Sequence, residues 1–374
     1  MTAKETLAQL VAIDSVSSRS NAPIVEYLQQ RCEAAGLITR LFSYTDESGL
    51  EKINLAALSE VSESPEIELA LVGHTDTVPY DPNWEQATRL TEEEGKLFGR
   101  GSCDTKGFIA ATLTAVEGVD LNQLQRPLAL VFTADEEIGL RGAKHLAQVK
   151  PFQIRFSIVG EPTSLQPIRA GKGYSLADVI VRGRESHSAY PALGVSAIVR
   201  AARLISRLEI IADQLKMDRH DGFDPPFTTL NVGVIKGGSA KNVIPGECRF
   251  TLEWRPIPTQ KPTHVLDLLH AAIEDEIRHD PDFRCEVDCD RNDSGFETDT
   301  QSPLVTFLES VTGKKAGSVA FGTEGAQMTI LGSEAVVLGP GDIREAHRTG
   351  EFVPVEELNR CVDILSQAIR HFCY

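Results

Sequence analysis

Short apolar segments recur along the first half of the chain, and they restrict the possible folds more than any other feature. Leu69–Gly73 and Leu128–Thr133 are nearly continuous apolar runs, without alternating polar residues. Such runs are typical of strands that helices cover on both faces. Gly107–Val116 and Gly139–Val149 have the pattern of helices. The first part of the chain therefore predicts an α/β domain with a mixed or largely parallel sheet.

The pattern changes after about residue 170. The following segments alternate apolar with polar residues, as strands with one wet face do, or repeat as amphipathic helices: Tyr174–Arg182, Cys248–Arg255, Val195–Leu208 and His264–Arg278. From about residue 296, segments with the pattern of buried strands and helices return. We predict one α/β domain formed by residues 1–170 and 289–374, interrupted by a smaller α+β domain of residues 171–288.

Composition excludes several classes of partner and location. The 374 residues include 37 Lys and Arg against 54 Asp and Glu, a net charge of −17, which argues against nucleic acid or an anionic membrane as partner. We find neither an apolar run of about 18 residues nor an apolar signal core at the N-terminus. The seven cysteines form no C-x-x-C pair. A reducing cytoplasmic location is therefore expected.

The segment Gly73–Pro79 carries the strongest single motif, His74-Thr-Asp76, at the end of a predicted strand. Residues two apart leave an extended chain on the same face. One of them can bind a metal through imidazole while the carboxylate orients that ring. Alone, the motif is weak, since a structural His–Asp pair explains it equally well.

Similar side chains follow other predicted strands and loops. They are Asp104 in the glycine-rich loop 99–107, the Asp135-Glu136-Glu137 run, Glu161 after Ser157–Gly160, and His347 after Leu338–Gly341. Each alone fits a solvated turn, but the carboxyl ends of strands in such a sheet meet at one edge. Two histidines with several carboxylates suit zinc, cobalt or manganese. Two such ions about 3.5–4 Å apart can activate a shared water and polarise a carbonyl, so the set predicts a hydrolase site.

In this order the motifs resemble the M20 metallopeptidases and amidohydrolases, over nearly the whole chain. The resemblance implies a zinc-peptidase-like catalytic domain with two divalent metal ions, zinc in the first place and cobalt as the alternative. Asp104 would bridge the two ions. The remaining ligands would be His74 and Glu161 at one ion, and Glu137 and His347 at the other. Glu136 would be the general base, and Asp76 would support His74.

The same resemblance makes the inserted domain a lid and dimerisation domain, and the protein a homodimer. His187, in Ser186–Pro191, would stabilise the oxyanion, and in this family such a histidine serves the neighbouring subunit. Asn242 and Arg255 resemble positions that grip substrate. From the residues alone, His187 also fits a turn histidine, and Arg255 a surface salt bridge.

The implied substrate is a small N-acyl amino acid. Within the family the residues are most similar to members that remove the acetyl group of N2-acetyl-L-ornithine, with Glu324 as a candidate for recognising the cationic amine. Acetylcitrulline, succinyl-diaminopimelate and dipeptides are alternatives. Outside catalysis, the alternatives are a catalytically silent binding protein of the family and a metal-free α/β binding protein.

Overall fold

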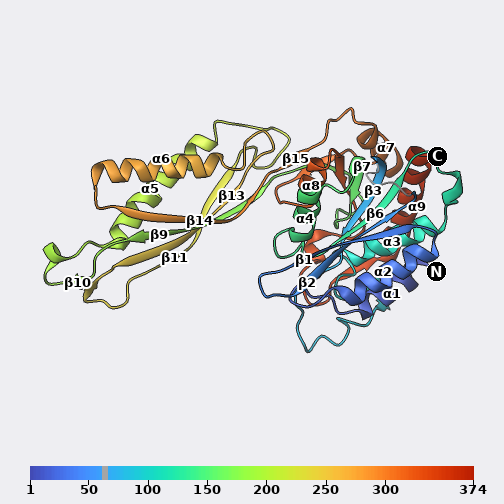
Figure 1. Ribbon diagram of the computed structural model, residues 1–374, viewed down its shortest axis with the longest axis horizontal. Helices are drawn as coiled ribbons and strands as arrows, with labels where there is room; N and C mark the ends of the chain where they lie inside the picture. Colours follow the sequence, from blue (N-terminus) through green and yellow to red (C-terminus); the bar gives the residue numbers. More distant parts are fainter. Residues whose placement is uncertain (61–65) are drawn as a thin grey trace. The chain divides into compact units, whose positions relative to one another are not determined.

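A computed structural model describes residues 1–60 and 66–374, and the chain divides into two compact units (Figure 1). The first comprises Met1–Arg169, Glu297–Gly317 and Thr323–Tyr374, and the second Ala170–Phe296 and Ser318–Gly322. Each unit has its own apolar core. The main breaks between the units fall after residues 169 and 296. The predicted boundaries fall after residues 170 and 288. The short return of the chain to the second unit at 318–322 was not predicted.

The first unit is built on a mixed sheet, which confirms the predicted fold class. Its strand order is β1-β2-β6-β3-β7-β17, followed by β8 and β15, with β16 pairing β8. The strands are β1 (Ile38–Thr45), β2 (Glu51–Leu58), β3 (Glu66–His74), β6 (Leu128–Thr133), β7 (Gln153–Val159), β8 (Ile168–Gly171), β15 (Phe296–Glu297), β16 (Gly317–Val319) and β17 (Glu334–Val337). Every residue of β6 is buried, as its continuous apolar sequence predicts.

Helices cover both faces of this sheet. They are α1 (Ala3–Ala12), α2 (Ala22–Ala34), α3 (Lys106–Glu117), α4 (Arg141–Val149), α7 (Pro303–Thr312), α8 (Gly325–Ile330) and α9 (Val355–Cys373). Helices α1, α2, α3, α7 and α9 share one continuous apolar core with alternate residues of the strands, such as Leu69 and Leu71. Helices α4 and α8 contact each other and, between them, strands β2, β7 and β17 (Figure 1). A small sheet of β4 (Thr91–Glu93), β5 (Lys96–Phe98) and β18 (Phe352–Pro354) completes the unit.

Four neighbouring strands of the large sheet run parallel and end at the same edge. In β3 and β6, His74 pairs with Thr133, and in β3 and β7, Val72 pairs with Val159. Strand β17 is parallel to β7, with Val337 opposite Val159. Residues that follow these four strands are therefore brought together, and the candidate site is expected at this edge.

The second unit is an antiparallel sheet with two helices. The sheet order is β11 (Thr229–Gly237), β13 (Glu247–Arg255), β9 (Tyr174–Arg182), β14 (Arg284–Asp293). Buried residues alternate along β9 and β13, as predicted, and pack against α5 (Ala197–Leu215) and α6 (His264–His279) in one core. A two-stranded ribbon joins β10 (Ser186–His187) to β12 (Val243–Ile244).

Helix α5 is longer than its sequence pattern indicated. The predicted helix ended at Leu208, but the helix continues to Leu215. The reason is visible in its buried face, where Leu204, Leu208, Ile211 and Leu215 follow one another at helical spacing and all lie in the core. Its N-terminus is capped by Ser196, whose hydroxyl accepts a hydrogen bond from the backbone N–H of Val199.

In the part of the chain that the structure describes, no helix combines the length and the apolar character that a bilayer crossing requires.

Candidate metal centre

Asp104 lies between the two histidines that the sequence singled out. Its Oδ1 is 2.9 Å from Nε2 of His74, and its Oδ2 is 3.1 Å from Nε2 of His347. The histidines come from distant parts of the chain: His74 is the last residue of β3, and His347 follows a 3₁₀ turn after β17. Asp104 itself is 5 % exposed in the loop before α3. One carboxylate thus faces a separate imidazole with each of its oxygens, the arrangement that a bridging ligand needs.

Glu137 and Glu136 follow β6, as predicted. Oε1 of Glu137 is 3.0 Å from Nε2 of His347, so Glu137 and Asp104 approach the same nitrogen. Both residues are partly exposed, and the side chain of Glu137 is 7 % exposed. The end of β6 thus brings two adjacent carboxylates to this edge, and one of them contacts His347.

Asp76 holds the backbone of both glutamates. Its Oδ1 accepts the N–H of Glu136 at 3.0 Å, and its Oδ2 accepts the N–H of Glu137 at 3.3 Å and the hydroxyl of Ser17 at 2.7 Å. Nδ1 of His74 lies 3.0 Å from the carbonyl oxygen of Asp76 and 3.7 Å from its Oδ1. Asp76 therefore contacts the ring of His74 and also anchors the glutamate loop, a second contact that the sequence did not reveal.

Glu161 follows β7 and is 7 % exposed. The chain can reach this position because the preceding residue is Gly160. A Cβ added there would lie 2.2 Å from the ring of Phe108 in α3, closer than packing allows. Glycine thus lets the end of β7 lie directly on α3, beside the loop that carries Asp104.

The carboxylates are crowded, and their proton affinities show it. Burial raises the pKa of Glu136 well above its usual value, with a further rise from the charge of Glu137, although His74 acts in the opposite direction. Burial also raises the pKa of Glu161, and the charge of Asp104 adds to the rise. Negative charge is therefore costly at this edge unless cations offset it.

The histidine contacts act in the other direction on Asp104. Burial alone would raise its pKa, but the hydrogen bonds from His347 and His74 outweigh burial and hold the pKa below its usual value. The hydrogen bonds that His347 makes with Asp104 and Glu137 raise the pKa of His347 to about 10. Positive charge at the histidine nitrogens is thus strongly favoured, as expected where the carboxylates are arranged to face a cation.

The residues fit a metal centre. One ligand atom each of His74, Asp104 and Glu137 lie within 4.8 Å of one another. Ligands of a tetrahedral zinc ion lie about 3.4 Å apart when metal–ligand bonds are about 2.0–2.2 Å long. The histidine–carboxylate contacts of 2.9–3.1 Å need to open by only a few tenths of an ångström. Imidazole and carboxylate donors are those that zinc and cobalt accept.

The predicted residues His187, Asn242 and Arg255 belong to the second unit. His187 and Asn242 lie close together, because the N–H of Ser188 donates to the carbonyl of Asn242 and His187 pairs with Val243. Both side chains are exposed. Nδ1 of His187 accepts the N–H of Ala189 at 3.1 Å.

Arg255 lies elsewhere in the second unit. Its Nε donates to Glu253 at 2.7 Å, and its guanidinium stacks 3.7 Å from the centre of the Tyr174 ring. The salt bridge that the sequence left open is therefore present, with an aromatic support. Its role in gripping substrate stays a prediction.

Glu324 precedes α8 in the first unit and is 1 % exposed. Its Oε1 accepts the hydroxyl of Thr133, the last residue of β6, at 2.5 Å. Burial raises the pKa of Glu324 to about 7. Glu324 is thus buried against the end of β6. Recognition of an amine by this side chain stays a prediction.

The sequence did not assign a role to several residues that support the site. Ser17 bonds to Asp76 from 59 residues away, and Lys52 donates to Oδ1 of buried Asp135 at 2.7 Å. Glu351 accepts the N–H groups of Cys103 and Asp104. Only Glu351 left a signal, as an acidic residue four positions after His347.

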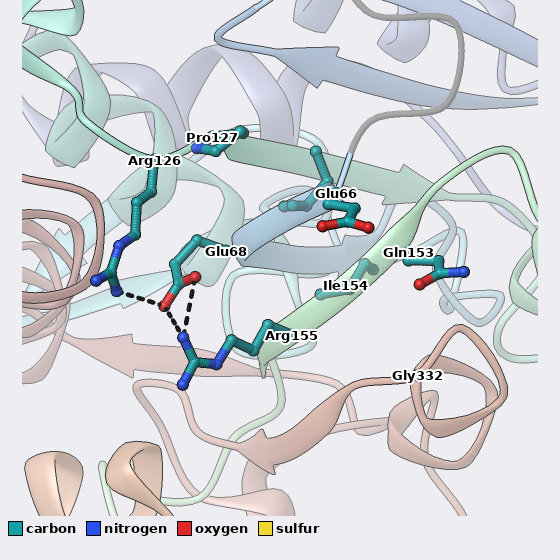
Figure 2. Close-up of a pocket in the computed structure, with 9 residues that line it drawn as sticks. Glu66, Glu68, Arg126, Pro127, Gln153, Ile154, Arg155 and Gly332 are labelled. Atoms are coloured by element: carbon teal, nitrogen blue, oxygen red, sulfur yellow. Dashed lines mark hydrogen bonds and ion pairs between the residues drawn. The ribbon is translucent and has the colours of Figure 1, made fainter.

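A cavity of about 510 Å³ lies away from these residues (Figure 2). It is lined by the first residues of β3 and β7, the amino ends of strands whose carboxyl ends carry the site. Figure 2 shows Arg126 and Arg155 both directed at Glu68, each 3.0 Å from its Oε1. None of the predicted site residues lines it, so it takes no part in the chemistry considered below.

Comparisons with known proteins identify the family of the chain. Residues 70–371 match the peptidase family M20/M25/M40. The chain is 53 % identical over 371 residues to an acetylornithine deacetylase of Myxococcus xanthus, covering 99 % of this chain and 97 % of the relative. Its fold is similar to that of a tripeptidase from Staphylococcus aureus, with a TM-score of 0.77 and 23 % identity, covering 99 % and 97 % of the two chains.

The fold is also similar to that of a dinuclear metal-binding peptidase of the M20 family from Bacillus subtilis. The TM-score is 0.67 at 12 % identity, and the match covers 99 % of this chain and 97 % of the other. Both matches therefore include residues of the first and of the second unit.

Proposed function

The chain belongs to peptidase family M20/M25/M40, and from this we propose that it hydrolyses N2-acetyl-L-ornithine to L-ornithine and acetate, a step of arginine biosynthesis, with two divalent metal ions. The relative from Myxococcus xanthus, 53 % identical over nearly the full length of both chains, supports the substrate. One structural observation carries the proposal. Asp104 faces His74 with one oxygen and His347 with the other, as a carboxylate between two metal ions would.

We assign the ligands as follows. Asp104 would bridge the two ions. His74 and Glu161 would complete one site, and Glu137 and His347 the other. Zinc suits this donor set best, and cobalt is the alternative. When bound, the ions would polarise the acetyl carbonyl and lower the pKa of a shared water to near neutral.

Glu136 would be the general base. It takes a proton from the water whose oxygen attacks the acetyl carbon, and it later gives that proton to the α-nitrogen of ornithine as the C–N bond breaks. A base with a pKa near the working pH is the most effective. Burial raises the pKa of Glu136, and bound cations would act on this pKa in the opposite direction. Asp76 would set the position of this base, since it accepts the N–H of Glu136.

The second unit would supply the contacts to substrate. His187 would donate a hydrogen bond to the oxyanion that forms on the acetyl oxygen, and Asn242 would contact the substrate beside it. Arg255 would bind the α-carboxylate; its bond to Glu253 uses Nε, so a bidentate pair would use the two Nη groups. In the first unit, Glu324 would recognise the side-chain amine. The enzyme would work in the cytoplasm.

Acetate release from N2-acetyl-L-ornithine tests the reaction. We expect the purified protein to release acetate, to lose this activity after treatment with a chelator, and to regain it with Zn²⁺ or Co²⁺. Acetylcitrulline, succinyl-diaminopimelate and a dipeptide serve as comparison substrates. If one of these is hydrolysed faster, it replaces N2-acetyl-L-ornithine as the proposed substrate. Acetate release that a chelator does not affect would contradict a metal-dependent reaction.

Glu136→Gln tests the base. The amide cannot take a proton from water, so kcat should fall by about 10²–10⁴-fold, while two equivalents of metal stay bound. Glu345→Gln is the matched control, because Glu345 pairs with Arg348 on the surface and should keep the activity of the unchanged protein. A Glu136→Gln protein that loses its metal, yet works at the normal rate once reloaded, would show that Glu136 is a ligand and not the base.

We further propose a homodimer formed by the second unit. Strand β11 is at the end of its sheet, where Val234 and Ile235 are each 52 % exposed. On α5, Ile198 and Val199 are also exposed. An edge strand beside exposed apolar side chains is a surface that a second copy can cover, by extending the sheet and burying the helix. In this arrangement His187 would serve the metal centre of the neighbouring subunit.

A hybrid dimer tests this arrangement. His187→Ala and Glu136→Gln proteins, each with a different tag, are refolded together and the hybrid is isolated by both tags. If His187 acts across the dimer, one site of the hybrid has both residues intact, and the hybrid should recover about half of the normal activity. A hybrid as inactive as either parent would mean that His187 acts within its own subunit.

A further inference from the structure

Glu351 is completely buried and is bonded to the loop that carries Asp104. Its exposed fraction is 0 %. Its Oε1 accepts two backbone N–H groups, those of Cys103 and Asp104, each at 3.0 Å. Its Oε2 accepts from Nη1 of Arg100 at 2.6 Å, in an ion pair whose two side chains are almost inaccessible to solvent. The carboxylate thus binds both ends of the segment 100–104.

The backbone of Glu351 binds the same loop. Its carbonyl oxygen accepts the N–H of Gly99 at 3.1 Å and the hydroxyl of Ser102 at 3.4 Å. Immediately after it, β18 pairs with β5, where Phe352 lies opposite Phe98. Side chain, backbone and neighbouring strand therefore all join this residue to the segment that ends in Asp104.

Glu351 also belongs to the segment that carries His347, four residues earlier. His347 has a φ of 58° and Gly350 a φ of 81°, so the chain between them turns tightly. His347 and Asp104 meet at 3.1 Å, although 243 residues separate them. Glu351 thus bonds the segment of His347 to the segment of Asp104, within a few residues of both.

We propose that Glu351 is a positioning residue of the metal centre: by holding the N–H of Asp104 and the loop before it against the His347 segment, it sets the affinity for metal. This rests on the proposed function only in requiring a metal centre, and not on its substrate. A ligand held by bonds behind it loses less freedom when the metal binds, and removing such outer contacts typically costs 10–100-fold in affinity.

The alternative is a purely structural role, in which the buried pair of Glu351 and Arg100 stabilises the fold alone. Burying two charges is expensive, and a buried ion pair is often no more stabilising than apolar residues of the same size. The two roles differ in what they predict for the folded protein. A structural residue changes the stability, whereas a positioning residue also changes the metal affinity of molecules that remain folded.

The test is the dissociation constant for Zn²⁺ of Glu351→Gln, from competition with a chromophoric chelator at a temperature where circular dichroism shows the variant folded. Glutamine can still accept from the two amides, but its NH₂ group faces the donors of Arg100, so the carboxamide must turn or move. We expect the affinity of at least one zinc site to fall about 10–100-fold. Excess Zn²⁺ should restore most of kcat, with KM unchanged. Glu345→Gln, six residues earlier at a side chain that pairs with Arg348, should bind Zn²⁺ like the wild-type protein.

Glu351→Asp is the second variant, in case Glu351→Gln does not fold. It keeps the charge opposite Arg100 but is one methylene too short to reach both groups at once, so we expect it to weaken Zn²⁺ binding as well. An affinity within twofold of the normal value in either folded variant overturns the positioning role. If the wild-type protein binds Zn²⁺ but hydrolyses no N-acyl amino acid, the proposed function is wrong. The test of Glu351 stays valid in that case, because it measures metal affinity.

Discussion

The parallel pairing of β6, β3, β7 and β17 is the constraint on which the metal centre depends. It brings four chain segments to one edge of the sheet with His74, the glutamate pair 136–137, Glu161 and the approach to His347. Asp104 enters the same edge from the loop before α3. A register shift of one residue in any of these strands would turn its side chains to the other face, so the cores on the two faces also fix the positions of the ligands.

The edge assembled in this way is electrostatically unfavourable without cations. Asp76, Asp104, Glu137 and Glu161 are all largely buried, and carboxylates that are buried together oppose one another's ionisation. The protein offsets part of this cost locally, since Asp76 accepts three hydrogen bonds, from Ser17 and from the backbone of Glu136 and Glu137. Two divalent cations would offset most of the rest. Metal binding and folding of this edge are therefore expected to support each other.

Much of this was predictable from the sequence, for physical reasons. Continuous apolar runs such as Leu128–Thr133 predicted buried strands because a strand covered on both faces has no polar side. The fold class followed from the alternation of such strands with helices, and it is confirmed. The gathering of His74 and Asp104 followed from the rule that strand ends share an edge together with a family resemblance. The structure places the side chains of His74, Asp104, Glu137 and His347 within contact distance. The roles of the predicted residues as ligands and base stay proposals.

The remaining features could not be predicted because they depend on contacts between distant segments. Ser17 meets Asp76 across 59 residues, and Glu351 meets Asp104 across 247. Neither the serine nor the glutamate has a local sequence pattern that distinguishes a buried, hydrogen-bonded residue from a surface residue. Helix α5 is a different case, because Ile211 and Leu215 follow Leu208 at helical spacing in the sequence, and the predicted helix simply ended too early.

Anomalous diffraction from crystals grown with Zn²⁺ tests the central claim most directly, namely that Asp104 joins two metal ions at this edge. We predict two zinc peaks about 3.5–4 Å apart, one within bonding distance of each oxygen of Asp104, with His74 at one ion and His347 at the other. A single peak, or two peaks of which neither contacts Asp104, would contradict the dinuclear centre.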